Sequence, residues 1–164
     1  MPEKTYSVSK RKSFFAVGPL AFFVIWISIQ QWPSTAEAAA ENPNDILVIT
    51  NKSVPDTSVS QVVARDLFLK VRKAWKNGAN VIPVVPADEK LRQDFRSRVL
   101  NMNSNDEKRY WENMKIKYGL GKPSEIANNQ KAVFSVKNSV TYVYRKDYNA
   151  GVTKIICVIP PSGN

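Results

Sequence analysis

After the first 40 residues, apolar residues occur in short runs separated by polar turns, and these runs predict strands alternating with helices. The first run, Asp45–Asn51, is rich in β-branched residues and lies between two prolines, which is typical of a strand. Because its apolar residues are consecutive rather than alternating, we expect both faces of this strand to be covered, as in a parallel or mixed sheet. Three more β-prone runs predict strands over Val81–Val85, Val140–Tyr144 and Val152–Ile159.

Between these runs, four segments carry apolar residues at helical spacing behind a residue that can cap a helix. Ser58 and Gln61 have the spacing of a capping box, and we expect the helix after them to continue towards the Asn77-Gly78 turn. Its apolar face contains Val62, Val63, Leu67, Phe68 and Val71, and its basic C-terminal part contains Lys70, Arg72, Lys73 and Lys76. Three further helices are predicted to begin at Asp88, at Ser104 with Glu107 in capping-box spacing, and at Ser124. This order of elements predicts an α/β layer fold.

The first 40 residues are typical of an export segment. A basic stretch ending at Lys12 precedes the apolar run 13–32, and Ala36-Glu37-Ala38 or Ala38-Ala39-Ala40 fits a cleavage site. The favoured interpretation is a cleaved signal peptide; the alternative is an uncleaved transmembrane anchor, because the run approaches the ~20 residues that a spanning helix needs. Either way, we expect 1–40 to be a leader and 41–164 to be one periplasmic domain, free or anchored to the inner membrane by residues 13–32.

Composition narrows the function classes. The chain has no histidine and a single cysteine, Cys157, so His-dependent catalysis and an internal disulfide are excluded. We expect Cys157 to pack as a small hydrophobe. Carboxylates such as Asp88, Glu89 and Asp94 have nothing in the sequence to orient them, so we expect no enzyme, no metal and no cofactor.

The net charge of +10, or +8 after removing four basic and two acidic leader residues, favours anionic partners. A solvated basic surface is the plainer interpretation of the same excess. Nucleic acid is a poor expectation for an exported chain, so we expect no nucleic-acid partner.

Several short motifs together resemble one family. They are Phe68-Leu69-Lys70 with Trp75 and Gly78, then Ile82-Pro83-Val84, Arg92 with Phe95, Tyr110-Trp111, Asn138–Val143 and Val152–Ile156. In this order they resemble the small phosphate-binding-protein-like domains of ABC-type uptake systems. The resemblance implies a periplasmic-binding-protein-like fold, with a mixed sheet flanked by helices. It also implies an exported binder of phosphate or a related oxyanion that works with an envelope permease or other membrane protein.

The chain departs from this family where the full-length binders hold phosphate with a Ser-Gly-Thr turn. Here Ala87–Arg92 lacks that turn, and the carboxylates of Asp88 and Glu89 stand where an anion would approach and would repel it. The chain is also about half the size of a two-lobe binder. These departures favour a second hypothesis, a ligand-less module that docks to a cell-envelope complex.

Seven residues are candidate ligand contacts. Thr50, Asn51, Lys52 and Ser53 follow the first strand, where open α/β sheets bind ligands, and the plain alternative is a polar loop. Arg92 can hold an anion bidentately or form a surface pair with Asp88 or Glu89. Ser139 and Thr141 can donate to a ligand or make ordinary strand hydrogen bonds. Four aromatic residues are expected to pack inside the protein rather than to form a binding surface: Trp75, Tyr110, Trp111 and Tyr118.

Overall fold

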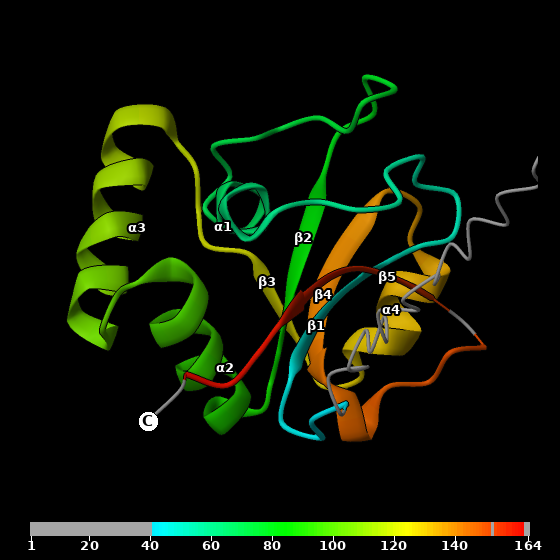
Figure 1. Ribbon diagram of the computed structural model, residues 1–164. Helices are drawn as coiled ribbons and strands as arrows, with labels where there is room; N and C mark the ends of the chain where they lie inside the picture. The colour runs from blue at the N-terminus through cyan, green and yellow to red at the C-terminus, as the bar shows by residue number, and fades with distance from the viewer. Residues whose placement is uncertain (1–40, 152, 163–164) are drawn as a thin grey trace, which may run out of the picture. The chain divides into compact units, whose positions relative to one another are not determined.

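The computed structural model describes residues 41–151 and 153–162 (Figure 1). The expectations about the leader, including the run 13–32 and both cleavage sites, lie outside these residues. Within them, no helix combines the length and the apolar character that a membrane crossing requires.

The sheet has five strands in the order β3-β2-β4-β1-β5. Their bounds are β1 (Ile46–Thr50), β2 (Ile82–Pro86), β3 (Ser124–Ile126), β4 (Ser139–Tyr144) and β5 (Lys154–Ile159). β2 runs parallel to β3 and β4, whereas β1 runs antiparallel to β4 and β5. All five residues of β1 are buried, as expected from its unbroken apolar run. The expected mixed sheet is confirmed, and β3 is a strand that the sequence did not predict.

Helices cover both faces of the sheet. α1 (Gln61–Phe68), α2 (Glu89–Phe95) and the π-helical turn η1 (Arg96–Leu100) lie on one face, and α4 (Asn129–Ser135) lies on the other (Figure 1). α3 (Ser104–Tyr118) follows η1 beside α2, and a short 3₁₀ turn, η2 (Arg145–Asp147), follows β4. Successive β1 side chains point to opposite faces: Ile46 and Val48 join the main core, and Leu47 joins a smaller cluster behind it. The expected flanking helices are therefore confirmed.

The helix predicted to continue towards Asn77 ends at Phe68 instead. Lys70 has a positive φ of 54°, which turns the chain back so that Trp75 enters the core with 3 % of its surface exposed. The buried carboxylate of Asp56 holds the returning loop by accepting from the backbone N–H of Lys76 at 3.2 Å and from Arg72 at 3.4 Å. The basic residues 70–76 therefore lie on a loop, because burial of Trp75 outweighs the helical pattern.

Three helix starts also differ from expectation by a few residues. Ser60, not Ser58, caps α1, and Asn103, not Ser104, caps α3 in a reciprocal box with Asp106. α4 begins after Asn128 rather than at Ser124, because Ser124 opens β3 and pairs with β2. The predicted cap of α2 at Asp88 is confirmed, and its side chain accepts from the backbone N–H of Leu91 at 3.0 Å.

Two positions of the predicted apolar face of α1 are exposed, and the single thiol is half-buried. Val62 is 68 % exposed because α1 turns Val63, Ala64, Leu67 and Phe68 towards the core, and Val71, beyond the end of the helix, is 60 % exposed. Cys157 on β5 packs against the main core, and burial raises the pKa of its thiol. The expectation that Cys157 packs as a small hydrophobe fits this position.

Candidate functional site

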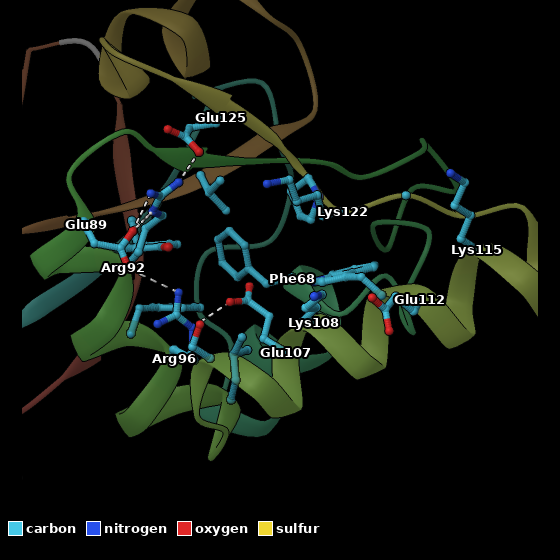
Figure 2. A pocket seen from close by; sticks show the side chains of 18 residues that line it. Phe68, Glu89, Arg92, Arg96, Glu107, Lys108, Glu112, Lys115, Lys122 and Glu125 are labelled. Carbon is cyan, nitrogen blue, oxygen red and sulfur yellow. Dashed lines mark hydrogen bonds and ion pairs between the residues drawn. The ribbon is translucent and has the colours of Figure 1, made fainter.

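A groove of about 580 Å³ opens between α2, η1 and α3, on the face of the sheet that β2 and β4 present (Figure 2). We call it the α2–α3 groove. Its walls combine aromatic and aliphatic side chains with a charged rim, and its size falls in the range of small-molecule sites, about 300–1,000 Å³. It is larger than a second hollow of about 350 Å³ among the described residues, which Leu67, Pro83 and Leu120 line.

Three aromatic rings in mutual contact form the floor of the groove. Phe95 lies flat on Tyr142, with ring centroids 3.8 Å apart and planes inclined by 6°. Phe68 meets both rings edge-on, at 4.8 Å from Phe95 and 5.2 Å from Tyr142. All three are almost fully buried, and burial raises the pKa of the Tyr142 hydroxyl above its ordinary value. The floor is therefore rigid and apolar.

α3 closes the groove while burying little of itself. Trp111 is its single buried residue. The helix is held to the end of α1 by the hydroxyl of Tyr110, which donates to the carbonyl of Leu69 at 2.7 Å, and by Lys70, whose Nζ lies 5.9 Å from the Trp111 ring centre. Partial burial lowers the pKa of Lys70. Gly119 ends α3 in the left-handed conformation, with φ at 65°. These few contacts leave the space between α3 and the sheet open.

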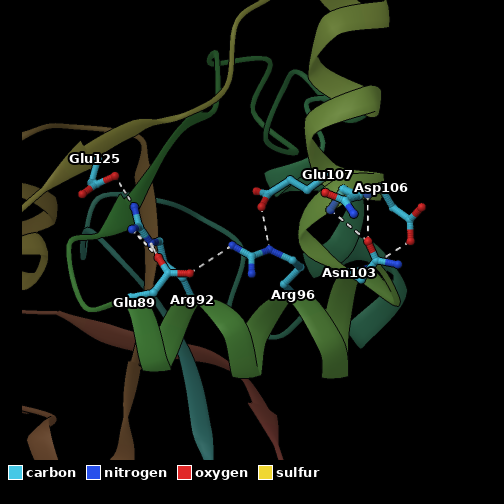
Figure 3. A network of polar contacts seen from close by, with 8 residues as sticks. Glu89, Arg92, Arg96, Asn103, Asp106, Glu107 and Glu125 are labelled. Carbon is cyan, nitrogen blue, oxygen red and sulfur yellow. Dashed lines mark hydrogen bonds and ion pairs between the residues drawn. The ribbon is translucent and has the colours of Figure 1, made fainter.

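A chain of ion pairs occupies the α2 side of the groove (Figure 3). Arg92 pairs with Glu125 of β3 and with Glu89, to which its Nε donates at 2.9 Å. Arg96 bridges Glu89, at 3.6 Å, and Glu107 of α3, to which its Nε donates at 2.6 Å. The hydrogen bonds from Arg92 are the largest cause of a lowered Glu89 pKa. The chain links four elements and leaves both arginines engaged with carboxylates.

The α3 side of the groove carries charges without such partners. Lys108, Lys115 and Lys122 line the groove and form no ion pair within residues 41–151 and 153–162. In Figure 2, Lys108 and Lys122 lie on the other side of Phe68 from the arginines, with Lys115 farther along α3. Glu112 is the acidic residue at this end. The groove is therefore polarised, with neutralised arginines at one end and ammonium groups at the other.

One buried donor in the groove wall lacks an acceptor. Trp111 is 9 % exposed, and its indole N–H has no hydrogen-bond partner in the part of the chain that the structure describes. Buried indole N–H groups usually find a partner, so this donor requires an explanation. Less than 1 Å² of this nitrogen is exposed, so an acceptor in the groove reaches it only if the wall moves.

Four of the seven predicted contacts come together elsewhere, at the opposite end of the sheet. The hydroxyl of Thr50 donates to the carbonyl of Ser139 at 2.6 Å, and Thr141 accepts from Asn129 of α4 at 3.2 Å. Asn51 donates to the carbonyls of Val133 and Phe134, at 3.0 and 2.7 Å, and Ser139 donates to those of Val133 and Val136. Thr50, Ser139 and Thr141 are fully buried. These side chains fasten α4 to β1 and β4. Thr50 is a buried strand residue and not part of the polar loop given as its plain alternative.

The loop residues Lys52 and Ser53 are exposed. Their loop does not lie at the end of the sheet where a ligand site was expected. Lys52 donates to the carbonyl of Gly151 at 3.0 Å, and the backbone N–H of Ser53 donates to Asn51 at 2.9 Å. Because β1 runs antiparallel to β4, its carboxyl end lies beside the amino ends of β2 and β4. The premise that this loop sits at the carboxyl edge of parallel strands is therefore wrong.

Arg92 lies at the other edge and is the predicted contact that lines the groove. Burial tends to lower its pKa, but its hydrogen bonds to Glu89 and Glu125 outweigh this and raise the pKa. Sequence reasoning allowed a surface pair with Asp88 or Glu89 but missed Glu125, because β3 was predicted as helix. It also missed Arg96, Lys108 and Lys122, which no pattern in the sequence marks as a set.

The arrangement can hold an anion and an apolar group without covalent chemistry. Among the described residues, no cluster of three or more His, Cys, Asp or Glu side chains could hold a metal ion. The titratable groups of the groove are carboxylates, arginines, lysines and the buried hydroxyl of Tyr142, and the carboxylates of Glu89, Glu107 and Glu125 are committed to ion pairs. These groups can attract, position and exclude ligands by charge.

No family model and no curated protein matches the sequence. Its fold is similar to that of a protein described as a phosphate ABC transporter substrate-binding protein from Clostridium perfringens, solved with bound phosphate: 15 % identity, TM-score 0.51, over 70 % of this chain and 45 % of that one. An ABC-type phosphate transport receptor from Vibrio cholerae is similar at 12 % identity and TM-score 0.53, over 75 % and 52 %. The chain thus spans about half the length of these proteins. At such identities the likeness shows the fold alone, over about half of each of these proteins.

Proposed function

We propose that this chain is a solute-binding domain that captures a small anion by non-covalent contacts in the α2–α3 groove. The observation that carries the proposal is the groove itself: a 580 Å³ site in a solute-binding-like fold, with lysines on its rim that form no ion pair among the described residues. Ammonium groups beside a low-dielectric floor attract anions more strongly than the same groups on an open surface.

Phosphate or a related oxyanion is the ligand that the sequence resemblance and the structural neighbours suggest. The Clostridium perfringens neighbour holds phosphate, which makes a small anion a reasonable first probe. The N-terminus of α2 is a poor position for it, because Asp88 caps that helix and Glu89 follows with its carboxylate charged. We therefore assign anion capture to the lysine end of the groove.

In this proposal the domain is exported and serves an ABC-type uptake system by delivering its solute to a membrane permease. The leader-like residues 1–40 support export, and the basic excess suits capture of anions. We also propose that the domain is no enzyme, since the groove offers charge and apolar surface but no activated nucleophile.

A second candidate is a protein-interaction module of a cell-envelope complex. The chain spans 45–52 % of the length of its structural neighbours, and the Ser-Gly-Thr turn of the full-length binders is absent at Ala87–Arg92. An exposed stretch of α3, including Ile116 at 83 % exposure and Tyr118 at 66 %, supports this alternative.

Thermal unfolding of the full chain in phosphate, sulfate and chloride at matched ionic strength separates the two. A ligand that binds the native state at a hundred times its Kd stabilises it by about 2.7 kcal/mol, which raises Tm by several degrees. We expect a rise that saturates with one oxyanion and falls in Lys108→Gln. Identical curves in all three salts would contradict capture of a bare oxyanion, and would favour the interaction module if organic anions also leave Tm unchanged.

A further inference from the structure

We infer that the ligand of the α2–α3 groove is an organic anion with an apolar body, such as an aryl or short alkyl carboxylate or phosphate monoester, and not a bare oxyanion. This inference rests on the proposed function, because it names the chemical class that the same site selects. Three features carry it: the engagement of the arginines, the aromatic floor and the polarity of the groove.

The groups best suited to a bare oxyanion are already occupied. Arginine recognises phosphate and carboxylate through a planar fork that donates two parallel hydrogen bonds. The forks of Arg92 and Arg96 are directed at Glu89, Glu107 and Glu125. An oxyanion entering here would displace a carboxylate that is already held, so its net gain would be small.

The remaining cations are lysines, which act as exposed point charges. Lys108, Lys115 and Lys122 are all exposed, and such charges are screened by salt over about 8 Å at physiological ionic strength. Contacts of this kind are worth little when solvent-exposed. They can orient an anionic head, but the affinity must come mainly from another part of the ligand.

The floor supplies that other part. Phe68, Phe95 and Tyr142 are each about 2 % exposed, so a ligand touches only their edges, and Val85 and the aliphatic stems of Arg96 and Lys108 supply further apolar surface that it can reach. Placing a naked anion against such surface costs desolvation without compensating hydrogen bonds. An aryl or alkyl group in the same place gains from burial, by about fourfold in affinity for each CH₂ removed from water. The floor therefore selects an apolar body.

The polarity of the groove fixes how such a ligand lies. Glu107 stands on the arginine side of Phe68 and would repel an anionic head, whereas Lys108 and Lys122 stand on the opposite side (Figure 2). Glu112 is one carboxylate against three ammonium groups at that end. The head then faces the lysines and the body covers the aromatic floor. The indole of Trp111 lies in the same wall, next to the lysine end.

Isothermal titration of the full chain with matched ligand pairs tests the inference. We expect phenyl phosphate to bind at least about tenfold more tightly than phosphate, and hexanoate more tightly than acetate by about fourfold per added CH₂ until the floor is covered. Lys108→Gln and Lys122→Gln should each weaken the organic anions about two- to fivefold. Lys117→Gln, which removes the same charge from an exposed position of α3 outside the groove, should leave them unchanged.

The outcomes separate the inference from the proposed function. If phosphate binds as tightly as phenyl phosphate, the apolar-body inference is overturned while anion capture stands. If no anion binds, both fail. If hexanol binds as tightly as hexanoate, the anionic head is refuted and the groove is an apolar site. Equal losses in Lys117→Gln and Lys108→Gln would move the binding away from the groove, and the unfolding midpoint of each variant shows that it remains folded.

Discussion

Arg92 provides the sharpest test of how the groove treats anions, because two carboxylates neutralise a group that would otherwise bind phosphate. Glu125→Gln removes one of these charges and leaves a side chain of similar shape. The Arg92 side chain is 22 % exposed, so its fork becomes reachable once Glu125 no longer competes. A hydrogen bond to a charged group is worth about 1.5–3 kcal/mol, which corresponds to a gain of about ten- to a hundredfold in phosphate affinity. The double variant with Glu89→Gln should gain more.

Isothermal titration with phosphate at pH 7 and constant ionic strength measures the gain. Glu112→Gln is the matched control, because it removes one negative charge from the groove lining at a residue without an ion pair in residues 41–151 and 153–162. Exposed ion pairs contribute about 0–1 kcal/mol to stability, so the variants should remain folded. An equal gain in Glu112→Gln would show that overall charge, and not release of Arg92, controls binding. No gain in Glu125→Gln would refute the neutralisation of Arg92.

Three further predictions concern stability. Phe95→Ala, which opens a cavity beside Tyr142, should lower the free energy of unfolding by about 3–5 kcal/mol in urea titrations, whereas Phe134→Ala, at a side chain 55 % exposed, should change it by less than about 0.5 kcal/mol. Asn103→Ala should cost about 0.5–2 kcal/mol in the same assay and Ser104→Ala should be near neutral; the reverse order would contradict the observed cap. The pKa of Glu89 is lowered mainly by its hydrogen bonds with Arg92, so this pairing adds its full contribution to the free energy of unfolding above pH 4.5 and loses it as pH falls through the lower, folded pKa. The free energies of unfolding of wild type and Glu89→Gln should therefore converge in acid. A difference that stays unchanged down to about pH 2 would contradict the pairing.

The helices and strands near the core could be predicted, because the apolar pattern and the capping residues of each segment indicate its burial and its ends. The unbroken run at β1 indicated a strand buried on both faces, and Asp88 indicated the start of α2. The end of α1 was not predictable from periodicity, because apolar spacing continues to Val71 while burial of Trp75 turns the chain at Lys70. β3 has three residues, which is too short for a pattern, and its pairing with β2 decides its conformation.

The site was less predictable than the fold, because it depends on strand direction and on packing that sequence patterns do not encode. Thr50 and Ser53 were chosen for following a strand, yet the antiparallel course of β1 takes them to the opposite sheet edge from Arg92. Phe95 lies in the core, but helical spacing could not indicate that α3 would leave an open groove above it. The ion pair between Arg92 and Glu125 joins residues 33 positions apart and follows only from the fold.

The central claim is that an anion binds in the α2–α3 groove, and the indole N–H of Trp111 reports on it most directly. The measurement is a ¹H–¹⁵N spectrum of the labelled full chain during titration with phosphate and then phenyl phosphate, with the Trp111 signal identified by its loss in Trp111→Phe. We expect that signal to move saturably with a ligand. The indole signal of Trp75, which donates to the carbonyl of Asn138 at 2.8 Å outside the groove, should stay in place. A stationary Trp111 signal with both ligands, or an equal shift of Trp75, would contradict the account.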